Sequence, residues 1–244
     1  MRGGWTGGMG RSVVRALLAW GTLVLAPALA AQTEPRLREA LRLQADGQSD
    51  SARVIVRGVL AATAPTDTLH PQAVFASALV AKDAPEQRRE LQRLVVEFPT
   101  SAWTAEALVR LAMLDFAGGN LRGAARNVDR LATDFPGAPQ LATAALWGAR
   151  SYFELRNPVL ACKWLADGMP KVGEDIELQN QLAFYQQRCT NVRLDAAAVD
   201  SARRTQDVVG LVEGDKPPAG AAEAGAPGPA PAVAPGAAPA TPAA

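Results

Sequence analysis

Few residues in this sequence are of types that could carry out chemistry, and the single histidine is the first of them. His70 stands directly before Pro71, in a stretch where we predict an exposed loop. One histidine cannot supply a zinc site of two or three, and no Gly-x-Ser-x-Gly turn accompanies it to complete a serine triad. Gly118 and Gly119 fall in a predicted turn between helices, not in a phosphate-binding loop. The sequence therefore predicts no catalytic residue, no metal site and no cofactor.

The acidic residues are scattered, and their densest group is Glu174, Asp175 and Glu177. We place this group at the start of a helix, where the positive end of the helix dipole favours negative side chains. A hydrolase with two catalytic carboxylates would also need a cleft, and nothing in the sequence indicates one. An enzyme on a helical scaffold is thus a hypothesis that we rank third, after the two given at the end of this section. It predicts a closed polar pocket that contains a carboxyl group with a shifted pKa.

The two cysteines, Cys162 and Cys189, are separated by 27 residues. In an oxidising compartment we expect such a pair to form a disulfide, which would join one late helix to the next. Two separate buried thiols are the alternative, since unpaired cysteine is common in helical cores. A redox-active pair usually has the closer Cys-x-x-Cys spacing, so neither interpretation makes these residues catalytic.

The amino-terminal thirty residues have the three parts of a secretory signal peptide. Arginines are present without any acidic residue, an apolar run extends from Val13 to Leu25, and small residues follow at Ala28 and Ala30. We predict cleavage after Ala30, which makes 1–30 the signal peptide. An uncleaved membrane anchor is the alternative, but a spanning helix needs about 20 apolar residues and Pro27 interrupts this segment.

Removal of the signal peptide leaves a nearly neutral chain. The full sequence has 25 basic and 24 acidic side chains, and the loss of three arginines leaves 22 against 24, a formal charge of −2. Binding to nucleic acid depends largely on lysines and arginines that neutralise phosphates, so we expect no nucleic-acid partner. Residues 31–213 are long enough for one ordinary domain.

An internal repeat organises this domain. The segment ADGQSDSA at 45–52 returns as AGGNLRGA at 117–124, and the dipeptide Phe-Pro occurs at 98–99 and again 37 residues later at 135–136. Small and apolar residues recur at helical spacing around these markers. A period of about 34 to 40 residues built from two helices is typical of a helical solenoid. We therefore predict an all-α fold, an α-solenoid of about four helical hairpins with a capping helix.

The spacing of 72 residues between the two matching segments is twice 36, which implies an intermediate copy. A helix at the end would cover the exposed apolar face of the stack, as terminal repeats must. The elements predicted after the first copy are, in order, a loop at 63–70, helices at 71–81 and 85–97, a fourth copy from Pro139 to Gly168 that turns at 156–158, a last helix at 174–189, and a weakly helical extension at 194–212.

Small residues are expected to set the distance between the two helices of a hairpin. The aligned pairs are Ala40 with Ala112 and Ala52 with Ala124. Alanine at these places lets two helices approach closely, while larger apolar residues beside them fill the gap between hairpins. Gly47 and Gly119 supply the permissive backbone needed where the first helix of a copy stops.

The third copy carries a characteristic order of large and small residues. These are Leu108, Leu111, Ala112, Ala124, Val128, Leu131 and Pro136. Their order resembles the tetratricopeptide repeat over about residues 35–170, although Asp115 stands where an aromatic residue is usual. The phrases EFPTSAWTAEALVRLA and DFPGAPQLATAALWGA are similar to the repeats of two bacterial envelope proteins, the outer-membrane assembly lipoprotein and the Tol-Pal coordinator. This chain lacks the lipid-acceptor cysteine of the first and an evident amino-terminal coiled coil like that of the second.

The resemblance implies that the first helix of each hairpin lines a concave surface, whose outward side chains would contact a partner. The candidate partner-binding residues are Glu106, Val109, Arg110, Met113 and Phe116 in the third copy and Trp147, Arg150 and Phe153 in the fourth. Arginine with aromatic side chains is the composition enriched at binding hot spots. The alternative is that most of these side chains pack between hairpins, as we expect Trp103 to do.

The character of the chain changes after Gly214. Residues 217–244 are almost wholly Pro, Ala and Gly, with Glu223 as the only charged residue, and such a composition cannot form a packed core. We predict a disordered tail at 214–244. It is a spacer through the cell wall, a ligand for a proline-binding groove, or a solvated end without a specific partner.

Two functional hypotheses follow. The first is an exported, non-enzymatic scaffold, periplasmic or secreted, that binds an envelope protein or an extended peptide in its concave groove. The second is a structural tether or a dimerising envelope component that acts through the Pro/Ala-rich tail. Peripheral association with the membrane or the cell wall is compatible with both.

The predicted export signal has a direct test. When the full-length chain is expressed in a bacterium with its own leader, the exported protein should begin at Ala31, because the small residues before it fit the signal peptidase. Intact-mass measurement and amino-terminal sequencing of the periplasmic fraction report this. A chain that retains residues 1–30 in the membrane fraction would support the anchor instead.

Overall fold

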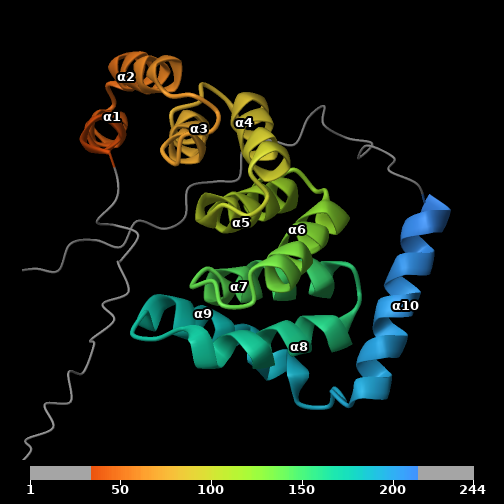
Figure 1. The fold of residues 1–244 in the computed structure, drawn as a ribbon. Helices are drawn as coiled ribbons and strands as arrows, with labels where there is room; N and C mark the ends of the chain where they lie inside the picture. The colour runs from red at the N-terminus through yellow and green to blue at the C-terminus, as the bar shows by residue number, and fades with distance from the viewer. Residues whose placement is uncertain (1–33, 214–244) are drawn as a thin grey trace, which may run out of the picture. The chain divides into compact units, whose positions relative to one another are not determined.

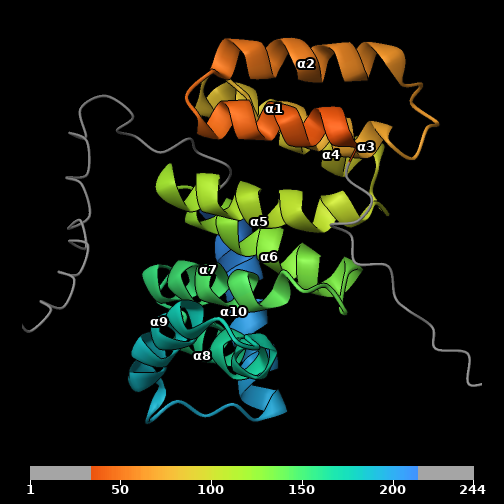
Figure 2. The ribbon, with the colours of Figure 1, turned by 90° about the vertical axis from the view of Figure 1, so that its left-hand side faces the viewer.

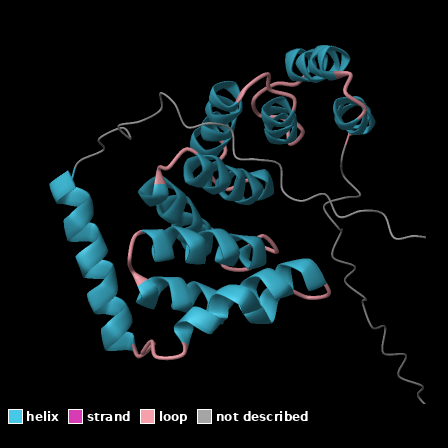
Figure 3. Ribbon diagram, turned by 180° about the vertical axis from the view of Figure 1, so that it is seen from behind, coloured by secondary structure: helices cyan, strands magenta, loops and turns pink. Residues whose placement is uncertain are grey.

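The computed structural model describes residues 34–213, which fold as a series of helices (Figure 1). No residue in this part of the chain forms a strand (Figure 3). The all-α fold class is therefore confirmed. The predicted signal peptide at 1–30 and the predicted tail at 214–244 lie outside the described residues.

Eight of the helices form four hairpins, each made of a first helix, a short turn and a second helix. The hairpins are α1 (Pro35–Ala45) with α2 (Ser49–Ala62), α3 (His70–Leu79) with α4 (Ala84–Glu97), α5 (Ala102–Ala117) with α6 (Leu121–Asp134), and α7 (Leu141–Glu154) with α8 (Pro158–Gly168). Each helix packs chiefly on the next helix along the chain. This succession confirms the predicted α-solenoid of four hairpins.

Within residues 34–213, two α-helices and two short 3-10 helices follow the hairpins. The elements are the short 3-10 helix η2 (Met169–Lys171), α9 (Ile176–Gln186), the 3-10 helix η3 (Gln187–Cys189) and α10 (Ala196–Glu213). Helix α9 packs on α7 and α8, as predicted for the capping helix. Helix α10, predicted only as a weak extension of that cap, is a separate helix that packs on α8.

The first helices of the hairpins lie on one side of the stack and the second helices on the other. Figure 2 looks at the first of these sides and places α1, α5, α7 and α9 toward the viewer, with α10 behind them. Contacts also join α3 with α5, α5 with α7, and α7 with α9. We call the surface formed by α3, α5, α7 and α9 the A face, and the surface formed by α4, α6 and α8 the B face.

The turn inside three of the hairpins holds one residue in the left-handed backbone region. The φ angle is 81° at Gly47, 76° at Gly119 and 57° at Arg156. The following residue closes each turn, and in the fourth hairpin the N–H of Asn157 donates to the carbonyl of Tyr152 at 2.8 Å. This is a common way for a helix to end. The two glycines were predicted, whereas Arg156 adopts the same backbone at a steric cost because it carries a Cβ.

A polar cap begins the second helix of three hairpins. Asp83, Asn120 and Asn157 stand directly before α4, α6 and α8. Their side-chain oxygens accept the N–H three residues further on at 2.7, 3.0 and 3.2 Å respectively. Each such cap stabilises a helix by about 1 kcal/mol, and their regular spacing is a repeat signal that our sequence analysis did not use.

The alanines at the predicted positions of close approach are completely buried. Those with no exposed surface include Ala40, Ala52, Ala112, Ala124, Ala149 and Ala161. The hairpin of α7 and α8 is tightest at Gly168, where an added Cβ would lie 2.1 Å from the Cβ of Ala145. Small residues therefore set the distance between paired helices, as predicted.

Asp115 is buried in α5. Arg88 from α4 donates to its carboxylate, and so do the side-chain amides of Asn120 and Asn127, at 3.1 and 2.8 Å. A buried carboxylate is tolerated only when it is paired and hydrogen-bonded. Asp115 thus provides a polar contact between the second and third hairpins.

The expectation that His70 lies in an exposed loop is wrong. His70 is the first residue of α3 and is buried, because Pro71 suits the first turn of a helix and the helix begins one residue earlier than predicted. Its Nδ1 lies 3.1 Å from the carbonyl oxygen of Thr63, and its ring centroid lies 5.6 Å from that of Phe98. The histidine thus fills the junction of the first two hairpins.

The two cysteines lie at disulfide-bonding distance, with 2.01 Å between the sulfur atoms of Cys162 and Cys189. Cys162 belongs to α8, and Cys189 ends η3. Of the two alternatives in the sequence, the structure favours the pair over two separate thiols. Its position ties the end of the capping helix to the last hairpin.

The strained turn at Arg156 gives a prediction about stability. Arg156→Gly should raise the free energy of unfolding by about 1 kcal/mol, because glycine adopts a positive φ without a steric penalty. Gly119→Arg is the matched reverse change, since nothing lies within 4 Å of the Cβ it would add, and it should lower stability by a similar amount. Urea denaturation measures both, and effects of the same sign would contradict this explanation.

Candidate functional site

Two regions of the described chain bring functional side chains together, and the first is the A face. The residues predicted there come from α5 and α7, where a spacing of three or four residues places side chains on one helix face. Contacts between neighbouring first helices then arrange these side chains as a series, with one set of contacts at each junction of the stack.

At the junction of α3 and α5, Arg110 forms an ion pair with Glu106, with 3.0 Å between Nε and the carboxylate oxygen. Its guanidinium carbon lies 5.5 Å from the centroid of the Phe75 ring. The ring of Phe75 also lies 5.3 Å from that of Trp103, so Trp103 packs as expected for an anchor. Both members of the ion pair are only partly exposed.

At the junction of α5 and α7, Arg150 contacts two aromatic rings. Its guanidinium carbon lies 4.6 Å from the centroid of Phe116 and 4.5 Å from that of Trp147. The two rings meet edge to face, with 5.5 Å between their centroids. A cation over an aromatic face is worth about 0.5 to 1 kcal/mol when exposed and more when water is excluded. The structure thus brings three predicted residues into one cluster.

At the junction of α7 and α9, Phe153 meets two residues that our sequence analysis did not select. Its ring stacks on Tyr185 at 6.2 Å, and the guanidinium carbon of Arg188 lies 3.9 Å from its centroid. Phe153 is only 8% exposed and Val109 only 3%. The expectation that these two point outward is wrong, because both are buried, and Phe153 is covered by Tyr185 of the capping helix and by Arg188.

The three arginines on this face differ in their ionic partners. Arg110 is paired with Glu106, but no carboxylate of the described residues lies within ion-pair distance of Arg150 or Arg188. A guanidinium that stacks on a ring leaves the N–H groups at its edge free for hydrogen bonds to an anion, because they point outward in its own plane. Met113, also predicted, is 38% exposed. The A face therefore combines aromatic surface with two arginines whose charge is not neutralised by a neighbouring acid.

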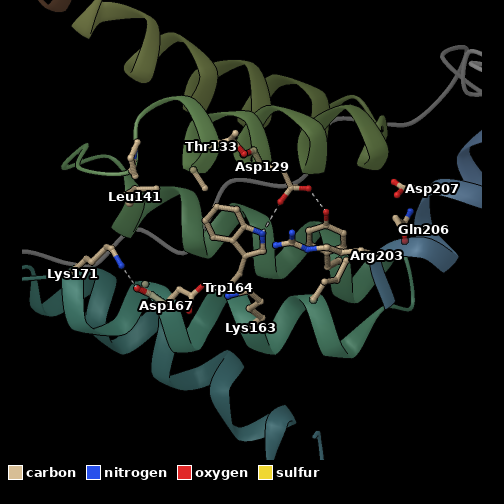
Figure 4. Close-up of a pocket in the computed structure, with 15 residues that line it drawn as sticks. Asp129, Thr133, Leu141, Lys163, Trp164, Asp167, Lys171, Arg203, Gln206 and Asp207 are labelled. Carbon is tan, nitrogen blue, oxygen red and sulfur yellow. Dashed lines mark hydrogen bonds and ion pairs between the residues drawn. The ribbon is translucent and has the colours of Figure 1, made fainter. Parts of the chain in front are cut away.

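The second region is a cavity of about 440 Å³ between α6, α8 and α10 (Figure 4). Its apolar lining includes Leu141, Leu160 and the indole of Trp164. Our sequence analysis missed it, because its walls come from helices far apart in the chain and no motif joins them.

Asp129 from α6 is one of three carboxylates that line this cavity, with Asp167 and Asp207. The hydroxyl of Tyr152 and the indole Nε1–H of Trp164 both donate to it, the latter at 3.1 Å. Burial raises the pKa of Asp129 above its ordinary value of 3.8, and Asp207 on α10 adds to this effect, whereas the two donors and Arg203 oppose it. The pKa of Tyr152 is raised as well, by burial and by the neighbouring negative charge.

A carboxyl group of shifted pKa in a pocket is what the enzyme hypothesis predicted. The two groups bonded to Asp129 do not exchange protons near neutral pH, since the Tyr152 pKa rises above its ordinary value of 10.0 and the indole of Trp164 does not titrate. Of these three groups, only Asp129 itself could act as an acid or a base.

The acidic group at 174–177 has the structural role that we predicted. Asp175 caps α9 by accepting the N–H of Leu178 at 2.9 Å, and Glu177 lies in the first turn of that helix. Among the described residues no group of three or more His, Cys, Asp or Glu side chains is arranged to hold a metal ion. Within the same part of the chain, no helix combines the length and apolar character needed to cross a membrane.

Comparison of the chain with protein-family models, curated proteins and solved structures found no significant match. These comparisons therefore assign no family.

The buried carboxyl group gives a prediction about pH. Because its pKa is raised in the folded state, the contribution of Asp129 to stability should fall as the pH rises from about 3.8 through that higher value. The unfolding free energy of the wild type minus that of Asp129→Asn should therefore decrease between about pH 3 and pH 8. Urea denaturation across this range provides the measurement.

Asp195 supplies a control of opposite sign. It caps α10, and the hydrogen bond from the N–H of Ala198 lowers its pKa. The wild type should therefore gain stability relative to Asp195→Asn as the pH rises from acid. If the unfolding free energy of the wild type relative to Asp129→Asn and that relative to Asp195→Asn changed in the same direction with pH, the opposite pKa shifts assigned to Asp129 and Asp195 would be wrong.

Proposed function

We propose that this protein is an exported, non-enzymatic repeat scaffold that binds an extended segment of another envelope protein across its A face. The observation that carries the proposal is the repetition of one contact, an arginine on an aromatic ring, at two successive junctions of first helices and again where η3, after the capping helix, meets α7. A solenoid presents such side chains at a regular rise, which suits an extended chain more than a compact ligand.

The chemistry of the A face indicates the kind of segment. Arg150 and Arg188 stack on rings but have no carboxylate partner among the described residues, so acidic side chains of a partner would pair with them. Met113 is exposed, Phe116 and Trp147 are partly exposed, and the three add apolar surface to the A face. A segment that alternates acidic and apolar residues would satisfy both, with the charges fixing its register.

Export to the periplasm or beyond is supported by two features. The amino-terminal residues have the pattern of a signal peptide, and the sulfur atoms of Cys162 and Cys189 lie at bonding distance, as in proteins of oxidising compartments. The resemblance of the repeats to the tetratricopeptide repeats of bacterial envelope proteins is in keeping with this compartment and with a role in envelope assembly or coordination.

Cross-linking in the native envelope tests the proposal. The double variant Arg150→Gln plus Arg188→Gln should lose the partner that the wild type captures, since both guanidinium contacts to its acidic groups are removed. The matched control is Arg57→Gln plus Arg93→Gln, which makes the same change of charge on the second helices α2 and α4 and should retain the partner.

The same experiment separates the proposal from the tether hypothesis. A chain lacking residues 215–244 should still capture the partner if the A face binds it. Loss of capture on this deletion, with capture intact in the arginine double variant, would overturn the proposal and favour a function of the tail.

A further inference from the structure

The cavity between α6, α8 and α10 contains an unequal distribution of charges. At one end Lys163 pairs with Asp167, with 2.6 Å between Nζ and Oδ2, and Lys171 donates to the backbone carbonyl of Asp167, also at 2.6 Å. Both lysines are thus held at the carboxyl end of α8. Asp129 and Asp207 belong to the other end, which α6 and α10 form.

Asp129 has hydrogen-bond donors but no counter-ion in direct contact. Its two partners, the Tyr152 hydroxyl and the Trp164 indole, are neutral, and no lysine or arginine of the described residues lies within ion-pair distance of it. Taking a carboxylate out of water without a cation beside it is costly. The raised pKa reports that cost.

One cation is nevertheless directed toward this end of the cavity. Figure 4 shows the side chain of Arg203 extending from α10 toward Trp164 and Asp129. It acts on Asp129 only at longer range and lowers the pKa of the carboxyl group through its charge. The cavity thus already accommodates a guanidinium on an alkyl chain, without bringing it into contact with the carboxylate.

Helix α10 forms the outer wall of the cavity and packs on α8. Near the start of α10, Val199 is buried and the Asn157 amide donates to the carbonyl of Ala202 at 3.1 Å. Further along this helix, Thr205 and Val208 are exposed.

We propose that this cavity binds a guanidinium or alkylammonium group, with Asp129 as its anionic partner and the ring of Trp164 as its aromatic wall. A carboxylate beside aromatic rings suits an organic cation, because both attract positive charge in a site with little water. Arg203 is the internal cation whose place near Asp129 the ligand takes. The cavity lies on the B face, so this site is independent of the proposed binding surface on the A face.

The indole N–H of Trp164 reports on the site directly, because it donates to Asp129. In a ¹⁵N-labelled chain that begins at Ala31, its resonance is identified by its loss in Trp164→Phe. Titration with agmatine or with N-acetyl-arginine amide should shift this resonance saturably. The uncharged N-acetyl-citrulline amide, of nearly the same shape, should not shift it.

Two variants assign the binding to the carboxylate. Asp129→Asn should weaken binding of the arginine amide about tenfold or more, because the charge-assisted contact is lost. Asp134→Asn, on the same helix but outside the lining, should leave it unchanged. Arg203→Gln should tighten binding several-fold, because it removes the competing cation; this result holds even if Asp129→Asn fails to fold.

The outcomes are distinct. A response to citrulline amide equal to that of arginine amide, or weaker binding in Arg203→Gln, would overturn the proposal. Tighter binding of the arginine amide than of agmatine identifies a basic side chain of a peptide as the source, and the reverse identifies a free amine. This titration does not involve Arg150 or Arg188, so its failure leaves the A-face proposal standing. In the same way, failure of the cross-linking experiment on the A face leaves the cavity proposal standing.

Discussion

The close approach of two helices at small residues is the constraint on which the rest of this structure depends. Alanines with no exposed surface, among them Ala112 and Ala124, hold the third hairpin together, and no side chain larger than glycine fits at Gly168 opposite Ala145. This close approach keeps each hairpin compact, and the first helices of successive hairpins contact one another. The aromatic–arginine contacts recur along this series.

The two faces of the stack use this regularity in different ways. On the A face neighbouring first helices are near enough for Arg150 to contact rings from both α5 and α7. On the B face the helix α10 packs on α8 but leaves a cavity beside α6, and Asp129 faces that space. A repeat fold thus offers one surface suited to an extended segment and one pocket suited to a small charged group.

The fold was largely predictable because its determinants are local. Gly47 and Gly119 mark turns through their backbone freedom, and the alanines mark helix contacts through their size. His70 was misplaced because its burial depends on Phe98, which directly follows the second helix of the same hairpin and which no pattern near residue 70 indicates. The cavity was missed for the same reason, since Asp129 gains its environment from three helices that follow it in the chain. Contacts between distant elements, more than helix formation, limited the sequence analysis.

Site-specific photo-crosslinking in the native envelope tests the central claim, that the A face is the contact surface, most directly. A photoreactive phenylalanine analogue at Met113, 38% exposed on the A face, is compared with the same residue at Val96, 76% exposed on α4 of the B face. Our account predicts an adduct at Met113 whose cross-linked peptide, identified by mass spectrometry, is rich in acidic residues, and none at Val96. An adduct at Val96 in the absence of one at Met113 would contradict it.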